Sequence, residues 1–218
     1  MSVLEPIPPA ILSVRRIPNA DDAVLRAYGA DPARHRSLGL VTVDQDDSTY
    51  VALDEATKHA EVDVVFAKSF YAGAAHSSGR LSGEILGVLA AADPDIVEEG
   101  LRALLRCLEH DACFYDADGK GTVTVFPHVI SSLGRYLSAQ AGLAPGTPMA
   151  YLVAPPVEGA VALDAALKAA NVRAVRVFTP PTETNFSAAW LTGDLEECQA
   201  AAMAYAQAVV DVALRPKA

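Results

Sequence analysis

The sequence lacks clusters of basic residues. Among its 218 residues, 17 are Lys or Arg and 27 are Asp or Glu, so the formal net charge is −10. An acidic chain with scattered basic residues does not attract phosphate polymers or anionic lipid surfaces. We therefore expect neither nucleic acid nor a membrane as a partner.

Long apolar runs are missing as well. No apolar stretch reaches the roughly 18 residues that a membrane-spanning helix needs. The first residues show no charged segment followed by an apolar core, so we expect no signal peptide. Three cysteines are present, Cys107, Cys113 and Cys198, and their odd number and irregular spacing are typical of a reducing compartment. These features predict a cytoplasmic protein.

Catalytic and metal-binding motifs are equally scarce. Phe114 stands where a P-loop before Gly119-Lys120 requires glycine. A calcium loop beginning at Asp44 would require glycine at position 49, which is Thr49. The five histidines form no HExxH motif, and no GxSxG elbow occurs. We expect no catalytic residue, no metal site and no cofactor, and hence a protein that is not an enzyme.

What the sequence does contain is an internal repeat. Val51-Ala-Leu-Asp54 recurs as Val161-Ala-Leu-Asp164 at an offset of 164 − 54 = 110 residues, about half of the chain. A repeat of this length is too long for a solenoid unit and indicates two copies of one domain. We expect domains at 1–113 and 114–218. We also expect Asp54 and Asp164 each to interact with a helix N-terminus.

Periodicity predicts the same order of elements in both halves, β-α-β-α-β-β-α. The expected strands are 12–17, 37–43, 62–66 and 84–89, then 122–126, 149–153, 172–178 and 186–191; the expected helices are 20–28, 53–60 and 93–109, then 128–141, a short helix within 161–172, and 194–214. Crossover helices and a β-hairpin predict an α+β fold with two ferredoxin-like domains. Each domain is expected to have a mixed four-stranded sheet with packed helices.

The two hairpin loops differ in length. The offset falls from 110 to 194 − 93 = 101 across them, so the first loop is about nine residues longer. Gly73 and Gly79 give the first loop backbone freedom, whereas Pro180-Pro181 stiffen the second. The first loop is therefore the better candidate for a moving segment.

Several motifs stand together in an order typical of one known family. They are Ser37-Leu-Gly-Leu40, Asp46-Asp47, Thr49-Tyr50, Asp54-Glu-Ala-Thr-Lys58, Tyr71-Ala-Gly-Ala-Ala-His76, Met149-Ala-Tyr-Leu-Val-Ala-Pro-Pro156, Asp164-Ala-Ala-Leu-Lys168 and Ser187-Ala-Ala. In this order the chain resembles the ethanolamine-utilisation shell proteins of bacterial microcompartments, of the tandem-domain, L type. The resemblance implies two circularly permuted microcompartment domains. It also implies a homotrimeric, pseudo-hexagonal tile that joins other shell proteins in a two-dimensional layer within the cytoplasm.

The resemblance further implies a gated central pore on the three-fold axis. The positions that match its two loops are Tyr71, Ala72, Gly73, Ala74, Ala75 and His76 in the first half and Pro180, Pro181, Thr182 and Glu183 in the second. We interpret the first loop as the gate, because its small residues permit a large backbone rearrangement.

A smaller pore within each subunit is also implied, where an amino alcohol such as ethanolamine is held. The matching positions are Asp46, Glu84, Ala112, Cys113 and Phe114, and Cys113 departs from the family pattern. Two carboxylates suit the ammonium group of ethanolamine, and the Phe114 ring suits its methylenes.

Two other functions remain open from the sequence. A ferredoxin-like trimer can act as a ligand-sensing module, which would stay a discrete particle rather than form sheets. An enzyme would need a convergent set of titratable groups, and no motif predicts one.

Overall fold

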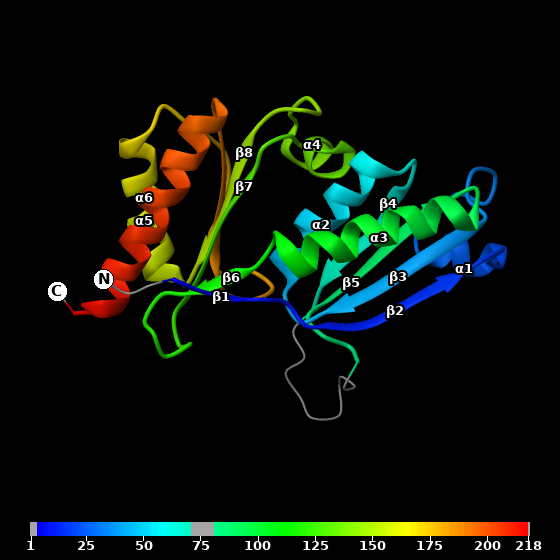
Figure 1. The fold of residues 1–218 in the computed structure, drawn as a ribbon, viewed down its shortest axis with the longest axis horizontal. Helices are drawn as coiled ribbons and strands as arrows, with labels where there is room; N and C mark the ends of the chain where they lie inside the picture. The colour runs from blue at the N-terminus through cyan, green and yellow to red at the C-terminus, as the bar shows by residue number, and fades with distance from the viewer. Residues whose placement is uncertain (1–3, 71–80, 218) are drawn as a thin grey trace. The chain divides into compact units, whose positions relative to one another are not determined.

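The computed structural model describes residues 4–70 and 81–217 (Figure 1). The chain forms two compact units, and neither is continuous in sequence. The first unit comprises 9–112 together with 134–139, and the second comprises 1–8, 113–133 and 140–218. The expected domains at 1–113 and 114–218 follow the sequence repeat. The compact units differ from these domains, because 1–8 belongs to the second unit and 134–139 to the first.

The first unit is built on a four-stranded sheet. Its strands, in spatial order, are β2 (Ile11–Ile17), β3 (Ser37–Val43), β5 (Ile85–Ala91) and β4 (Asp63–Ser69). All neighbouring strands are antiparallel, so the expectation of a mixed sheet is wrong. The crossover helix α2 (Asp46–His59) does join two parallel strands, β3 and β4. However, β5 lies between them and is antiparallel to both, because a hairpin reverses the chain.

Helices cover this sheet. Helix α3 (Pro94–His110) packs against α2 and the sheet (Figure 1). It begins where Asp93 accepts a hydrogen bond from the Asp95 amide, with proline in the first turn. Helix α1 (Asp22–Ala27) contributes the buried Leu25 to a core cluster with strand residues.

The second unit repeats this plan and extends it. Its six-stranded antiparallel sheet has the order β1 (Glu5–Ile7), β6 (Phe114–Asp116), β7 (Thr124–Ile130), β8 (Met149–Ala154), β10 (Ser187–Thr192) and β9 (Arg173–Phe178). Helices α5 (Pro156–Ala169) and α6 (Leu195–Leu214) pack together, and α6 buries Tyr205 and Val209 in the core. The expected order of elements and the α+β class are confirmed.

Three helix starts were predicted wrongly. Helix α5 begins at Pro156 rather than near residue 161, because proline fits the first turn of a helix. Helix α2 begins at Asp46 rather than near residue 53, because Ser48 and Thr49 bond back to Gln45 and bring the polar segment into the helix. Helix α4 (Arg135–Ala141) begins seven residues later than predicted, because His128 still lies in β7 and pairs with β8.

The segment 134–139 belongs to the first unit because Asp54 holds it. The Asp54 carboxylate accepts hydrogen bonds from the amides of Gly134 (2.7 Å) and Leu137 (2.8 Å), at the start of α4. The expected contact of Asp54 with a helix N-terminus is confirmed, although the helix is α4 rather than its own. Asp164 instead forms an ion pair with Lys168 (2.5 Å). No helix in the described ranges is long and apolar enough to span a membrane.

Candidate functional site

Polar side chains gather at one end of the first unit's sheet. Val43, the last residue of β3, pairs with Ile85, the first residue of β5, and Ile85 pairs in turn with Ser69 at the end of β4. The residues that adjoin these strand ends therefore lie together. They include Asp46 and Glu84, which are far apart in sequence.

Gly83 fixes the position of Glu84. Its φ is +63°, and a Cβ at this position would lie 2.2 Å from the carbonyl oxygen of Val43. Only glycine tolerates both conditions. The close approach lets the Glu84 amide donate to the Val43 carbonyl at 2.8 Å, while the Glu84 carbonyl accepts from the Phe70 amide at 2.9 Å.

Asp46 lies buried at the start of α2. Its Oδ1 accepts a hydrogen bond from the Asp47 amide at 2.9 Å, and the Ser69 side chain also hydrogen-bonds to its carboxyl group. The Ser69 hydroxyl lies 2.8 Å from the Tyr50 hydroxyl, which accepts the Ser69 amide at 3.2 Å. Asp46, Ser69 and Tyr50 thus form a connected polar network, and Glu84 lies beside it.

Electrostatics make this cluster a candidate cation site. Burial raises the pKa of Asp46. Burial, then the charges of Asp46 and Asp44, raise the pKa of Glu84. Burial and the nearby Asp46 also raise the pKa of Tyr50. Because Asp46 and Asp44 make ionisation of Glu84 harder, a bound cation would relieve the repulsion.

The structure brings together only part of the site expected from the sequence. Asp46, Glu84 and the buried Ala112 belong to the first unit, whereas Cys113 and Phe114 belong to the second. Within the second unit, the Phe114 ring packs against Phe126 and Phe186, with centroid distances of 5.0 and 6.5 Å. The five-residue site as a whole stays a prediction.

Sequence reasoning missed two members of the cluster. Tyr50 stands four residues after Asp46 on α2, so helical spacing would have found it had the helix start been predicted correctly. Ser69 joins only through strand pairing, for which the sequence gives no local signal.

Of the two loops expected at a central pore, the structure describes the second but not residues 71–80 of the first. Tyr71, Ala72, Gly73, Ala74, Ala75 and His76 lie outside the described residues. The second loop, which connects β9 to β10, contains the exposed Pro180, Pro181 and Glu183. Thr182 closes this loop on itself: its hydroxyl donates to the Phe186 carbonyl at 2.8 Å, and its carbonyl accepts the Asn185 amide at 3.2 Å.

The acidic cluster occurs in one half of the repeat only. At an offset of 110, Pro156 stands in the position of Asp46. None of residues 184–188, around the start of β10, is acidic. The two halves therefore share a fold but differ in charge at this end of the sheet.

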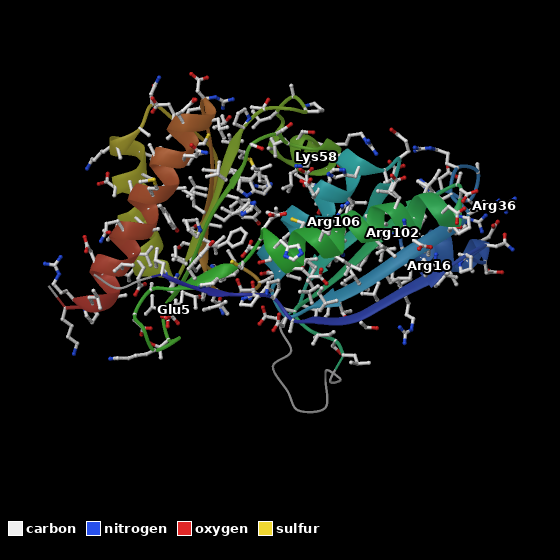
Figure 2. The ribbon with its side chains drawn as sticks, viewed as in Figure 1. Glu5, Arg16, Arg36, Lys58, Arg102 and Arg106 are labelled. Atoms are coloured by element: carbon white, nitrogen blue, oxygen red, sulfur yellow. The ribbon has the colours of Figure 1, made fainter. Side chains whose placement is uncertain are left out.

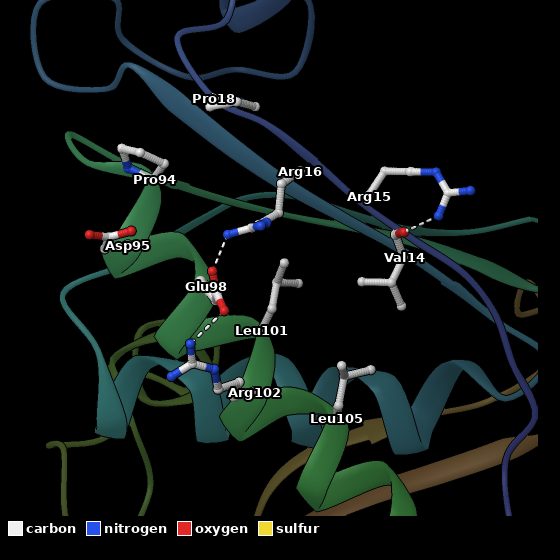
Figure 3. Close-up of a pocket in the computed structure, with 10 residues that line it drawn as sticks. All are labelled: Val14, Arg15, Arg16, Pro18, Pro94, Asp95, Glu98, Leu101, Arg102 and Leu105. Carbon is white, nitrogen blue, oxygen red and sulfur yellow. Dashed lines mark hydrogen bonds and ion pairs between the residues drawn. The ribbon is translucent and has the colours of Figure 1, made fainter.

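A groove with a volume of about 720 Å³ lies beside β2 and α3. Arg16 and Arg102 line it from opposite sides, and both bind Glu98 between them (Figures 2 and 3). Glu98 therefore neutralises part of the positive charge that these two guanidinium groups bring to the groove. No group of three or more metal-ligating side chains occurs in the described part of the chain.

Comparison with known proteins identifies the class. A model of the BMC domain matches residues 37–106, from the start of β3 into α3. The fold and this match define a protein with two tandem, circularly permuted bacterial microcompartment domains; the match leaves out β2 and α1, which open the first half.

Two curated relatives cover nearly the whole chain. The bacterial microcompartment shell protein EutL of Clostridium perfringens is 48% identical over 210 residues, covering 96% of each chain. EutL of Salmonella typhimurium is 45% identical over 216 residues, covering 99% of this chain and 98% of the relative. This chain belongs to the EutL family of bacterial microcompartment shell proteins.

Solved structures agree with this assignment. The crystal structure of the ethanolamine utilization protein EutL from Leptotrichia buccalis has a TM-score of 0.93 at 46% identity, covering 99% of both chains. A trimeric bacterial microcompartment shell protein, PduB, has a TM-score of 0.74 at 18% identity, covering 94% of this chain and 89% of that one. At 18% identity, the likeness to PduB shows a shared fold and nothing more.

Proposed function

We propose that this shell protein is a homotrimeric tile without enzymatic activity, in a microcompartment for ethanolamine catabolism. Membership of the EutL family supports the proposal, as does the tandem repeat. Three chains with two domains each give six similar domains, enough for a pseudo-hexagon that packs in a plane with other shell proteins. In this tile, the hairpin loops that contain Tyr71–His76 and Pro180–Glu183 would line a central pore, and the longer one would act as the gate.

The trimer is testable by mass. The chain has a mass of 22.8 kDa, so light scattering at micromolar concentration should give a particle about three times heavier. A monomer at that concentration would contradict the tile.

We also propose that the acidic cluster binds a small primary ammonium compound such as ethanolamine. The observation that carries this is that the buried Asp46 lies close enough to Glu84 for its charge to raise the pKa of Glu84. An ammonium group offers three donors to these carboxylates, and the Ser69 and Tyr50 hydroxyls lie beside them for the alcohol end.

Glu84→Gln tests the site, because it removes one charge with little change in shape. Charge-assisted hydrogen bonds contribute about 1.5–3 kcal/mol, so ethanolamine binding by calorimetry should weaken about tenfold or more while the trimer persists. The matched control is Glu61→Gln, an exposed acid beyond the opposite end of α2, and it should bind like the wild type. Equal binding by Glu84→Gln and wild type, or no binding by wild type at millimolar amine, would refute the site.

A further inference from the structure

The groove between strand β2 and helix α3 has the size and the lining of a small-molecule site. It lies entirely within the first unit. Its volume of about 720 Å³ falls in the range of ligand pockets, about 300–1,000 Å³. Five of its lining residues are apolar, three are arginines and two are acidic, so it offers both an apolar surface and charged groups.

Gly39 explains why a hollow forms at this place. It lies on β3 opposite Arg16 of β2, and a Cβ there would lie 2.8 Å from a Val97 methyl group and 2.9 Å from one of Leu101. The missing side chain lets α3 pack close to β3. Because β2 is the outermost strand of the sheet, α3 leaves a hollow beside it, and Val14 on β2 is only partly buried.

The lining carries more positive than negative charge. Three arginines and two acids give 3 − 2 = +1, in a chain whose net charge is −10. Glu98 binds Arg16 and Arg102 at once, as Figure 3 shows. The hydrogen bond from Arg102, then the charge of Arg16, lower the pKa of Glu98. Glu98 is therefore ionised at neutral pH and holds the two guanidinium groups around one point.

Arg15 is the arginine of the groove that no acid balances. Within residues 4–70 and 81–217 it forms no ion pair, and its Nη1 donates to the Val14 carbonyl at 2.8 Å. A guanidinium group offers five N–H donors in a planar fork that matches the oxygens of a carboxylate, sulfonate or phosphate. Arg15 can thus bind an anionic group without giving up an existing ion pair.

We propose that this groove binds a small amphipathic anion, a molecule with one acidic head and an apolar body. The head binds the guanidinium groups of Arg15 and Arg16, and the body lies on Val14, Leu101 and Leu105. Glu98 repels the head and so lowers the affinity. The site is independent of the acidic cluster, which selects the opposite charge.

Anilinonaphthalene sulfonate is a suitable probe, because it joins an aromatic body to a sulfonate and fluoresces more strongly out of water. Titration of the whole protein should show saturable binding. Octanoate should displace the dye, whereas octylamine, which has the same body and the opposite charge, should not. Displacement by both, or no saturable binding, overturns the proposal. Displacement by polyglutamate but not by octanoate would overturn it in favour of an acidic protein segment.

Two variants with effects of opposite sign locate the site. Arg15→Gln should weaken octanoate binding, measured by displacement of the dye, about threefold to fivefold, which is the effect of one exposed ion pair. Glu98→Gln should strengthen it by a similar factor, because the head then meets no repulsion. Unchanged circular dichroism spectra would show that neither variant exposes the core to the dye.

Arg106→Gln is the matched control. Arg106 is exposed on α3 and does not line the groove, so this variant removes the same charge as Arg15→Gln from a neighbouring surface. It should bind octanoate like the wild type. Equal weakening by Arg15→Gln and Arg106→Gln, or weaker binding by Glu98→Gln, would show that the anion does not bind in this groove.

Discussion

Asp46 shows how burial disfavours the ionised form of a carboxyl group. Burial raises its pKa above the unfolded value of about 3.9, so the folded protein binds more protons than the unfolded chain between pH 4 and the raised pKa. Stability therefore falls as pH rises through this window, and the ionised group destabilises the fold at pH 7. A bound ammonium group would offset that cost.

Asp46→Asn should remove the penalty. We expect the free energy of unfolding at pH 7 to rise by about 1 kcal/mol, the lower end of the cost of burying a polar group in mutational data. The gain should shrink as pH falls toward 4, because the raised pKa lets the wild-type carboxyl take up its proton in the folded state. Urea unfolding from pH 4 to 7, at one protein concentration, measures both quantities. A less stable Asn variant at pH 7 would show that the ionised carboxylate stabilises the fold.

Gly83 is the residue on which the geometry of the cluster depends. Gly83→Ala should lower the free energy of unfolding by about 3 kcal/mol, because it combines a positive φ with a contact of 2.2 Å to the Val43 carbonyl. Gly119→Ala is the matched control: its φ is +70°, but a Cβ there meets nothing within 4 Å, so it should cost about 1 kcal/mol. Equal costs in chemical denaturation would show that the close contact relaxes freely.

At the scale of elements, the docking of α4 depends on one buried acid. Asp54→Ala removes two charge-assisted hydrogen bonds and leaves the Gly134 and Leu137 amides unsatisfied, so we expect a loss of about 2–4 kcal/mol. Asp211→Ala, an exposed acid on α6, should change stability by less than about 0.5 kcal/mol. Denaturant titration compares the two variants. A small effect of Asp54→Ala would mean that apolar contacts alone hold the segment.

The sequence predicted elements well where local pattern determines them. Strand β3 and helix α3 lie where alternation, capping and proline placed them. The start of α2 escaped prediction because Asp46 and its polar neighbours are typical of a loop until the Gln45 contacts form. The bond between Asp54 and Gly134 spans 80 residues, and no local signal predicts such a contact.

The candidate site likewise combines residues that the sequence identified with residues that only the fold brought together. The resemblance to the family identified Asp46 and Glu84, and strand pairing in the first unit brings both to one end of the sheet. Tyr50 and Ser69 joined them only once the fold was known. Antiparallel pairing in both sheets was also missed, because the crossover helix indicates parallel strands but not the strand inserted between them.

At the scale of the whole molecule, duplication is the central feature. Two similar domains in one chain let the first half carry an acidic cluster that the second half lacks, which a ring of six identical domains could not do. In the proposed trimeric tile, this difference would place three candidate cation sites around the axis.

The most direct test of the account is electron microscopy of the purified protein over a range of concentrations. A shell tile has edges that match those of its neighbours, so we predict extended two-dimensional arrays of three-fold particles at high concentration. Discrete trimers at every concentration, with no arrays alone or with partner shell proteins, would contradict the tile and favour a ligand-sensing module.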